Sequence, residues 1–232
     1  SGVTKRFGAL TANDAIDLDL RRGEILALLG ENGAGKTTLM SILFGHYVAD
    51  AGDIEVFGRP LPGGSPRAAI AAGLGMVHQH FTLAENLSVI DNVTIGTEPL
   101  WALRRDRAKA RRRLAELGSR FGLTVDPEAR VGALSVGERQ KVEILKALYR
   151  DARILILDEP TAVLTPQESE RLFVTLRAMV ACGLSIIFIS HKLPEVMAVS
   201  DRVAVLRAGR LIEQRDAAGL DRAMLAELMV GR

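Results

Sequence analysis

The sequence that decides the fold is EILALLGENGAGKTTLMSILF, residues 24–44. The stretch from Glu24 to Leu29 is mostly apolar and predicts a buried β-strand, and the stretch from Thr37 to Phe44 predicts a helix. Between them, GENGAGKT at residues 30–37 matches the pattern G-x-x-x-x-G-K-[ST], which cradles phosphates where it joins a strand to a helix. The sequence therefore predicts a phosphate-binding loop in the structural context that this motif requires.

The residue types in this loop suit ATP with Mg²⁺. Glycines let successive backbone N–H groups converge on phosphate oxygens, and the start of the following helix adds favourable partial charge. We expect Lys36 to reach the β- and γ-phosphates, Thr37 to bind Mg²⁺ and Thr38 to add a phosphate contact. The predicted ATP contacts are Gly30, Glu31, Asn32, Gly33, Ala34, Gly35, Lys36, Thr37 and Thr38.

A second predicted strand, Arg153 to Leu157, ends in two carboxylates. A buried strand holds the side chains at its end rigidly, so Asp158 is placed to bind Mg²⁺ while Glu159 faces a water. Glu159 is then the candidate general base, which orients and deprotonates the water that attacks the γ-phosphorus.

Strand patterns alternate with helix patterns along the chain, which predicts a parallel sheet with crossover helices. Further strands are predicted at Ser185 to Ile189 and Arg202 to Leu206, and a helix at Pro166 to Ala181. Apolar and polar residues alternate from Ala15 to Leu20, which predicts a strand of an antiparallel β layer. Residues from about Glu85 to Arg150 predict helices, interpreted as an inserted subdomain.

Composition limits the function classes. Lys and Arg total 30 against 28 Asp and Glu, a net charge of +2 that gives no general attraction to nucleic acid or anionic lipid. The basic stretch from Arg104 to Arg113 is interpreted as a solvated helix face. No apolar stretch approaches the roughly 18 residues of a membrane span, because charged residues interrupt every hydrophobic run. The single cysteine, Cys182, is predicted to be a small buried residue in a reducing, cytoplasmic setting.

The segment LSVGERQ, residues 134–140, resembles the LSGGQ motif of ATP-binding cassette (ABC) ATPases. The resemblance implies an α/β fold: a P-loop (RecA-like) parallel-sheet core with an antiparallel β subdomain, formed by residues 1–84 and 151–232, and a helical subdomain at about 85–150. It implies that Ser135 and Gly137 contact ATP held by a second ABC domain. As an alternative or concurrent role, Ser135 and Glu138 form a helix capping box.

Three further positions continue the resemblance. Phe7 stands where the family has an aromatic residue that stacks on adenine. Gln79 resembles the glutamine that touches Mg²⁺ or water, and His191 the histidine that bonds the γ-phosphate. Two positions depart from it: Val136 replaces a small residue of LSGG, and Thr165 stands where the family usually has Asp.

The sequences of residues 75–81, 143–149 and 189–193 resemble segments of the ATPase subunits of bacterial simple-sugar and nucleoside importers. That resemblance implies the N-terminal half of a longer chain whose C-terminal half supplies the second ABC domain. It also implies permease subunits as partners, an extracytoplasmic solute-binding protein as an indirect one, no nucleic acid, and a location on the inner face of the cell membrane. The alternatives are a soluble ABC factor acting on ribosomes or nucleic acid, and a small-molecule P-loop kinase.

Overall fold

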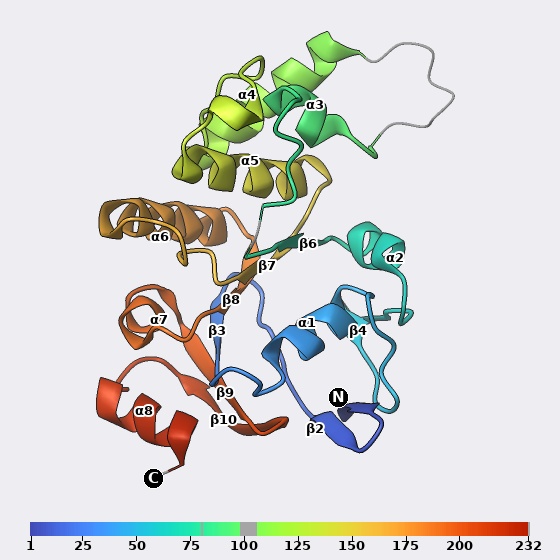
Figure 1. Cartoon of the computed structure of the whole chain (residues 1–232), viewed down its shortest axis with the longest axis vertical. Helices are drawn as coiled ribbons and strands as arrows, with labels where there is room; N and C mark the ends of the chain where they lie inside the picture. The colour runs from blue at the N-terminus through green and yellow to red at the C-terminus, as the bar shows by residue number, and fades with distance from the viewer. Residues whose placement is uncertain (80, 98–105, 232) are drawn as a thin grey trace.

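The computed structural model describes residues 1–79, 81–97 and 106–231. Its core is a six-stranded sheet in the order β10-β9-β3-β8-β7-β6 (Figure 1). Five of these strands are parallel, and β10 joins β9 in an antiparallel hairpin at one edge. The strands are β3 (Ile25–Leu29), β6 (Leu74–Val77), β7 (Ile154–Asp158), β8 (Ser185–Ile189), β9 (Arg202–Arg207) and β10 (Arg210–Asp216). The predicted parallel sheet is confirmed.

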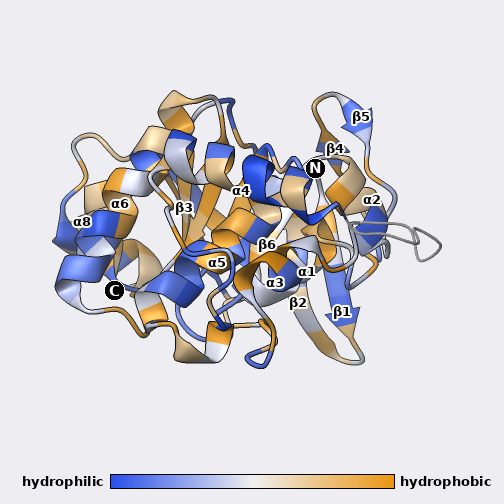
Figure 2. Ribbon diagram, turned by 90° about the horizontal axis from the view of Figure 1, so that it is seen from above, coloured by the Kyte–Doolittle hydropathy of each residue, from blue (hydrophilic) through white to orange (hydrophobic). Residues whose placement is uncertain are grey.

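Alternate residues of the central strands enter two separate cores, one on each face of the sheet. In β3, Ile25, Ala27 and Leu29 face one core, while Leu26 and Leu28 face the other. All five side chains are fully buried, as the apolar strand sequence predicts for a sheet covered on both sides. Figure 2 shows hydrophobic colouring on β3, in the interior of the molecule.

Helices cover both faces. One face carries α1 and α2, and the other carries the helices that follow β7, β8 and β10 (Figure 1). The helices of the core are α1 (Lys36–Leu43), α2 (Pro66–Ala71), α6 (Pro166–Ala181), α7 (Leu193–Val199) and α8 (Arg222–Val230). Two small antiparallel hairpins complete this part: β1 (Val3–Phe7) with β2 (Leu10–Ile16), and β4 (Glu55–Val56) with β5 (Arg59–Pro60).

The predicted strand from Ala15 to Leu20 is wrong in position. Strand β2 ends at Ile16, and Ala15 has φ 46°, a left-handed conformation that interrupts the alternation of a strand. Beyond it, the Asp19 carboxylate pairs with buried Arg202 on β9 at 3.0 Å. This ion pair connects the segment after β2 to the central sheet. The antiparallel β layer itself is present.

Three helices lie together at one end of the molecule, above the sheet edge formed by β6 and β7 (Figure 1). They are α3 (Val89–Thr94), α4 (Arg107–Phe121) and α5 (Val136–Tyr149), with a short 3₁₀ turn, Val131–Ala133, before α5. The helical character predicted for residues 85–150 is confirmed. The division of the chain into a core and a helical subdomain at these boundaries stays a prediction.

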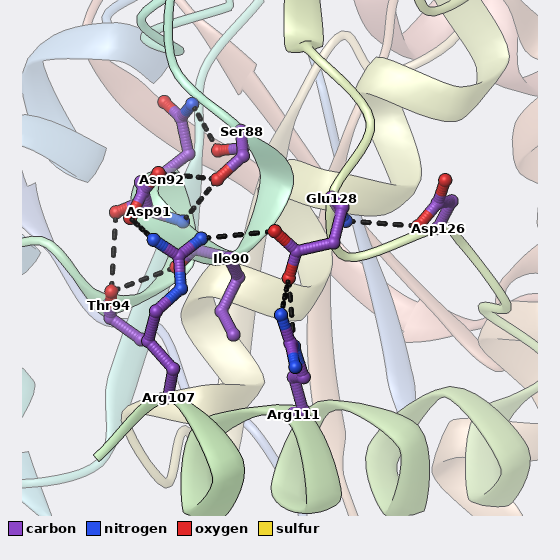
Figure 3. A network of polar contacts seen from close by, with 9 residues as sticks. All are labelled: Ser88, Ile90, Asp91, Asn92, Thr94, Arg107, Arg111, Asp126 and Glu128. Atoms are coloured by element: carbon purple, nitrogen blue, oxygen red, sulfur yellow. Dashed lines mark hydrogen bonds and ion pairs between the residues drawn. The ribbon is translucent and has the colours of Figure 1, made fainter. Parts of the chain in front are cut away.

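Part of the basic stretch takes part in holding these helices together (Figure 3). On α4, Arg107 and Arg111 pair with Glu128 at 3.2 and 2.7 Å, and Arg107 lies 3.6 Å from Asp91 of α3. Arg104 and Arg105, which complete the stretch, lie outside the described residues. Cys182 is exposed at the C-terminal end of α6, so the prediction that it is buried is wrong. Cys182 is the C-cap residue, one position beyond the last residue of the helix.

Within the described residues, no helix combines the length and the apolar character needed to cross a bilayer.

Candidate nucleotide site

The phosphate-binding loop joins the end of β3 to α1, as the sequence predicts. Its glycines are required by close packing as well as by backbone conformation. A Cβ on Gly35, which has φ 100°, would collide with the carbonyl oxygen of Ala12 and approach Asn13 Nδ2 to 2.7 Å. A Cβ on Gly30 would collide with the carbonyl oxygen of Leu206. The loop is therefore wedged between β2 and β9.

Lys36 is buried at the first position of α1, and its side chain turns back into the loop. Its Nζ donates hydrogen bonds to the carbonyl oxygens of Gly30 at 2.7 Å and Glu31 at 3.0 Å. Burial lowers the pKa of Lys36, and the carboxylates of Glu159 and Asp158 oppose that shift. These carboxylates act on the Lys36 charge because the ends of β3 and β7 open onto the same cleft.

Three parallel strands deliver the other candidates to this edge of the sheet. Gln79 follows β6, Asp158 ends β7, Glu159 comes next, and His191 follows β8. The carboxyl ends of parallel strands meet at one edge, which is where open α/β sheets bind ligands. The structure places these side chains with the phosphate-binding loop around a cleft of about 610 Å³.

Glu159 is the centre of a small polar cluster. Its Oε1 lies 2.8 Å from His191 Nδ1, and its Oε2 accepts a bond of 3.4 Å from Gln79 Nε2. Glu159 has φ 46°, and its backbone N–H bonds the carbonyl oxygen of Ile189 at 3.0 Å. Because of this left-handed backbone conformation directly after β7, the side chain of Glu159 leaves the strand in a different direction from that of Asp158. Glu159, Gln79 and His191 are thus brought together by three different strand ends.

Asp158 lines the same cleft and is half-buried. Burial is the main cause that raises the pKa of Asp158, the neighbouring charge of Glu159 adds to it, and His78 and Lys36 oppose it. Burial also lowers the pKa of His78, and the adjacent His46 ring contributes. His80, which the sequence places next to Gln79, lies outside the described residues.

Phe7 lines the open end of the same cleft, at the tip of the β1–β2 hairpin. Phe7 is 43% exposed, and the ring of Tyr47 meets its ring edge-on with 5.4 Å between centroids. Lys5 Nζ lies 5.5 Å from the Phe7 centroid. An exposed aromatic ring that is supported by a neighbouring ring can stack on a planar base.

Of the predicted phosphate-loop contacts, Asn32, Gly33, Ala34, Gly35, Lys36, Thr37 and Thr38 line the cleft. Gly30 and Glu31 do not line it; their carbonyl groups hold Lys36. Ser135 and Gly137 lie elsewhere, beside a separate cavity of about 170 Å³ between α5 and α6. Ser135 caps α5, its side chain accepting from the N–H of Glu138 at 3.3 Å.

Sequence reasoning missed two residues that hold the phosphate-binding loop in place. Asn13, fully buried on β2, donates from Nδ2 to the carbonyl oxygen of Gly35 at 3.1 Å. Gly209, in the β9–β10 turn, donates its backbone N–H to Ala34 at 3.1 Å. The sequence does carry the signal of a turn at Ala208-Gly209, but it carries no sign that this turn touches the phosphate-binding loop.

A phosphate-binding loop between a buried parallel strand and a helix, opposite a strand that ends in two carboxylates, defines a P-loop nucleotide-binding protein. Residues 13–162 match the sequence family described as ABC transporter. The chain belongs to this family.

Curated relatives and solved structures agree with this assignment. The chain is 48% identical to the nucleoside import ATP-binding protein NupA of Lactococcus lactis subsp. cremoris, over 99% of this chain and 46% of that protein. It is 50% identical to the ribose import ATP-binding protein RbsA 1 of Burkholderia thailandensis, over 100% and 46%. The chain thus spans about half the length of these relatives. It superposes on cbiO1 of Clostridium perfringens, part of the ABC transporter complex cbiONQ, with a TM-score of 0.82 at 27% identity, covering 99% of this chain and 90% of that one.

A second structure supports the fold alone, because its identity is low. The ATP-binding cassette MJ1267 in its ADP conformation superposes with a TM-score of 0.86 at 22% identity, over 100% of this chain and 97% of that one. The predicted α/β P-loop fold is confirmed by these superpositions.

Proposed function

We propose that this chain is the ATP-binding and ATP-hydrolysing domain of an importer for nucleosides or simple sugars. One observation carries the catalytic part of the proposal: a single cleft gathers the phosphate-binding loop, Asp158, Glu159, Gln79 and His191. P-loop hydrolysis needs a phosphate cradle, a metal site and a group that orients water, and these residues offer each of them.

In the proposed complex, Phe7 stacks on adenine and the loop from Gly30 to Thr38 holds the phosphates. Lys36 exchanges its bonds to the carbonyl groups of Gly30 and Glu31 for phosphate oxygens. Glu159 orients the attacking water and accepts its proton, since its carboxylate is open to the cleft. Gln79 and His191, which already contact Glu159, hold the water and the γ-phosphate beside it.

The donor set also fits Mg²⁺. The hydroxyl of Thr37, the carboxylate of Asp158 and the amide of Gln79 border the same cleft, and they are oxygen ligands of the kind that Mg²⁺ accepts while it keeps several waters. Burial and Glu159 disfavour the ionised form of Asp158, so a divalent cation at this place would favour that form. When bound, Mg²⁺ supplies charge neutralisation at the β- and γ-phosphate oxygens.

We propose that Ser135 and Gly137 serve a second ABC domain. They lie outside the cleft of their own chain but at the start of α5, where a helix N-terminus favours an anion. Val136 is the first residue of α5, and its φ is not positive, so the departure from a small residue needs no left-handed backbone. The partner domain belongs, in this proposal, to the C-terminal half of the full-length chain.

The relatives named above support the transport role, because NupA and RbsA 1 are import ATP-binding proteins that this chain matches over 46% of their length. In this role the chain docks on permease subunits at the inner face of the cell membrane and serves an extracytoplasmic solute-binding protein indirectly. The proposal includes no nucleic-acid partner. It draws support from Arg107 and Arg111, whose guanidinium groups are paired with Glu128.

Isothermal titration with Mg-ATP and a phosphate-release assay test the proposal in the chain assembled with its partner domain. We expect Lys36→Ala to abolish measurable Mg-ATP binding, and Glu159→Gln to retain binding while turnover falls by at least about 100-fold. Lys109→Ala, at an exposed position of α4, is the control and should bind as the wild type does. Unchanged binding by Lys36→Ala would exclude the assigned phosphate site, and unchanged turnover by Glu159→Gln would exclude the assigned base.

A further inference from the structure

We infer that Glu195 is a positioning residue for hydrolysis, because its carboxylate ties the loop that follows Glu159 to the loop that carries His191. Glu195 lies in the first turn of α7. It does not line the cleft, so it contacts neither nucleotide nor water in the proposed complex. The inference rests on the proposed function, since it concerns how the candidate base and histidine are held.

Two buried hydroxyl groups from different loops share one oxygen of this carboxylate. Thr161 Oγ1, two residues after Glu159, donates to Glu195 Oε2. Ser190 Oγ, directly before His191, donates to the same oxygen at 3.2 Å. Both residues are 2% exposed, and the Glu195 side chain is 13% exposed. A buried hydroxyl needs an acceptor, so loss of the carboxylate would leave both loops with an unsatisfied donor.

Lys192 completes the bridge from the far side of His191. Its Nζ lies 3.0 Å from Glu195 Oε1 and donates to the carbonyl oxygen of Thr161 at 3.2 Å. Its backbone N–H donates to Ser190 Oγ at 3.1 Å. The residues on both sides of His191 are therefore tied to the Thr161 loop, two of these ties passing through Glu195.

This arrangement controls the relation between Glu159 and His191. The two side chains meet at 2.8 Å, yet they stand on separate loops at the ends of the neighbouring strands β7 and β8. The strands fix where each loop begins, whereas the Glu195 bridge fixes how the loops lie beyond that point. Misplacement of a reacting group by about 1 Å costs roughly 100-fold in rate. A shift of these loops should therefore slow hydrolysis without disturbing the phosphate-binding loop, which lies on β3 and α1.

The test uses Glu195→Gln in the assembled protein, because glutamine keeps the shape and one acceptor oxygen but loses the charge and the Lys192 pair. We expect kcat for ATP to fall by about 10- to 100-fold while Kd for Mg-ATP stays within about twofold. Thr161→Val, which removes one hydroxyl at nearly constant shape, should lower kcat in the same way. The double variant should be no slower than the slower single one, since both changes break one bridge. Glu170→Gln, on an exposed position of α6, is the control and should keep the wild-type kcat.

Three results would overturn the inference: a wild-type kcat for Glu195→Gln, a Kd that weakens as much as kcat, or single effects that multiply in the double variant. If Glu195→Gln does not fold, as judged by thermal unfolding, Thr161→Val and Ser190→Ala carry the same test, and a wild-type kcat for both rejects the bridge. Glu159→Gln separates the two proposals. Normal turnover there removes the assigned base, whereas an inactive Glu159→Gln beside a fully active Glu195→Gln removes only the role of Glu195.

Discussion

Gly35 shows at the scale of one residue why the phosphate-binding loop tolerates so few side chains. It has a left-handed backbone, it packs against Ala12 on β2, and its carbonyl oxygen accepts from buried Asn13. Gly33 also has a positive φ of 81°, but no atom lies within 4 Å of the place where its Cβ would stand. A comparison of substitutions at these two glycines therefore separates the effect of backbone strain from the effect of close packing.

We predict that Gly35→Ala destabilises the nucleotide-free protein more than Gly33→Ala. Each substitution costs about 1–2 kcal/mol for a side chain in a left-handed conformation. Gly35→Ala also has to displace the β2 backbone, which adds about 1–3 kcal/mol of overpacking. Urea unfolding without nucleotide gives both values. Equal losses would mean that β2 does not restrain the loop.

The starts of α5 and α6 form a pair at the scale of secondary-structure elements. Each helix begins with a capping box, Ser135 with Glu138 and Thr165 with Glu168. The two ends lie side by side, because a Cβ on Gly137 would come within 2.9 Å of Glu168 Oε1. Thr165 therefore has a local role of its own. Since Asp caps helices as well as Thr does, this departure from the family pattern preserves the helix start.

The capping box formed by Thr165 and Glu168 should make the free energy of unfolding depend on pH. The backbone N–H and the hydroxyl of Thr165 lower the pKa of Glu168 from its ordinary 4.5. A carboxylate with a lowered folded pKa stabilises the protein above its unfolded pKa, and this contribution is lost as the pH falls through the folded pKa. We predict that the wild type is more stable than Glu168→Gln at about pH 6 and that the difference is smaller at about pH 3.

Chemical unfolding at the two pH values measures this difference, with Glu170→Gln as the control on the same helix. Glu170→Gln should have nearly the same unfolding free energy as the wild type at about pH 6. A Glu168→Gln deficit that persists unchanged in acid would assign the effect to packing and not to charge.

At the scale of the whole molecule, the residues that resemble the ABC signature stand apart from the chain's own cleft. Ser135 and Gly137 border the cavity between α5 and α6, whereas the phosphate-binding loop lies at the end of β3. If these residues meet a phosphate, it is one held by a second domain. Moving an equilibrium between open and closed pairs from 1:99 to 99:1 requires about 5.5 kcal/mol of preferential ATP binding.

We predict that Ser135→Asp leaves Mg-ATP binding by its own chain unchanged but weakens ATP-dependent association with the partner domain by at least about tenfold. Aspartate keeps the helix cap and adds a negative charge that would face the partner's triphosphate. The comparison uses Glu159→Gln as the background and analytical ultracentrifugation as the measurement. Ser88→Asp is the matched control, because Ser88 likewise caps α3 beside an acid three residues later. Equal association by both variants contradicts a role for Ser135 across the interface.

Much of this molecule could be predicted from short stretches of sequence. The strand, loop and helix at residues 24–44, the strand that ends in Asp158 and Glu159, and the strand before His191 all carry local patterns of hydrophobicity or phosphate binding. Parallel strands bring their carboxyl ends to one edge, so these patterns place Glu159 and His191 at the same edge as the phosphate-binding loop. Gln79 was placed there only by the family resemblance.

Packing between distant segments decided the rest. The left-handed conformation of Ala15 and the ion pair between Asp19 and Arg202, 183 residues apart, accompany the end of β2 at Ile16, although the strand was predicted to run to Leu20. The contact of Asn13 with Gly35 and the bridge from Glu195 to Thr161 and Ser190 likewise join residues on different elements. The sequence by itself determined which strands and loops exist and which of them carry phosphate chemistry, because those patterns are local. Only the tertiary structure decided which buried polar groups hold them, because hydrogen-bond partners are chosen by proximity after the chain has folded.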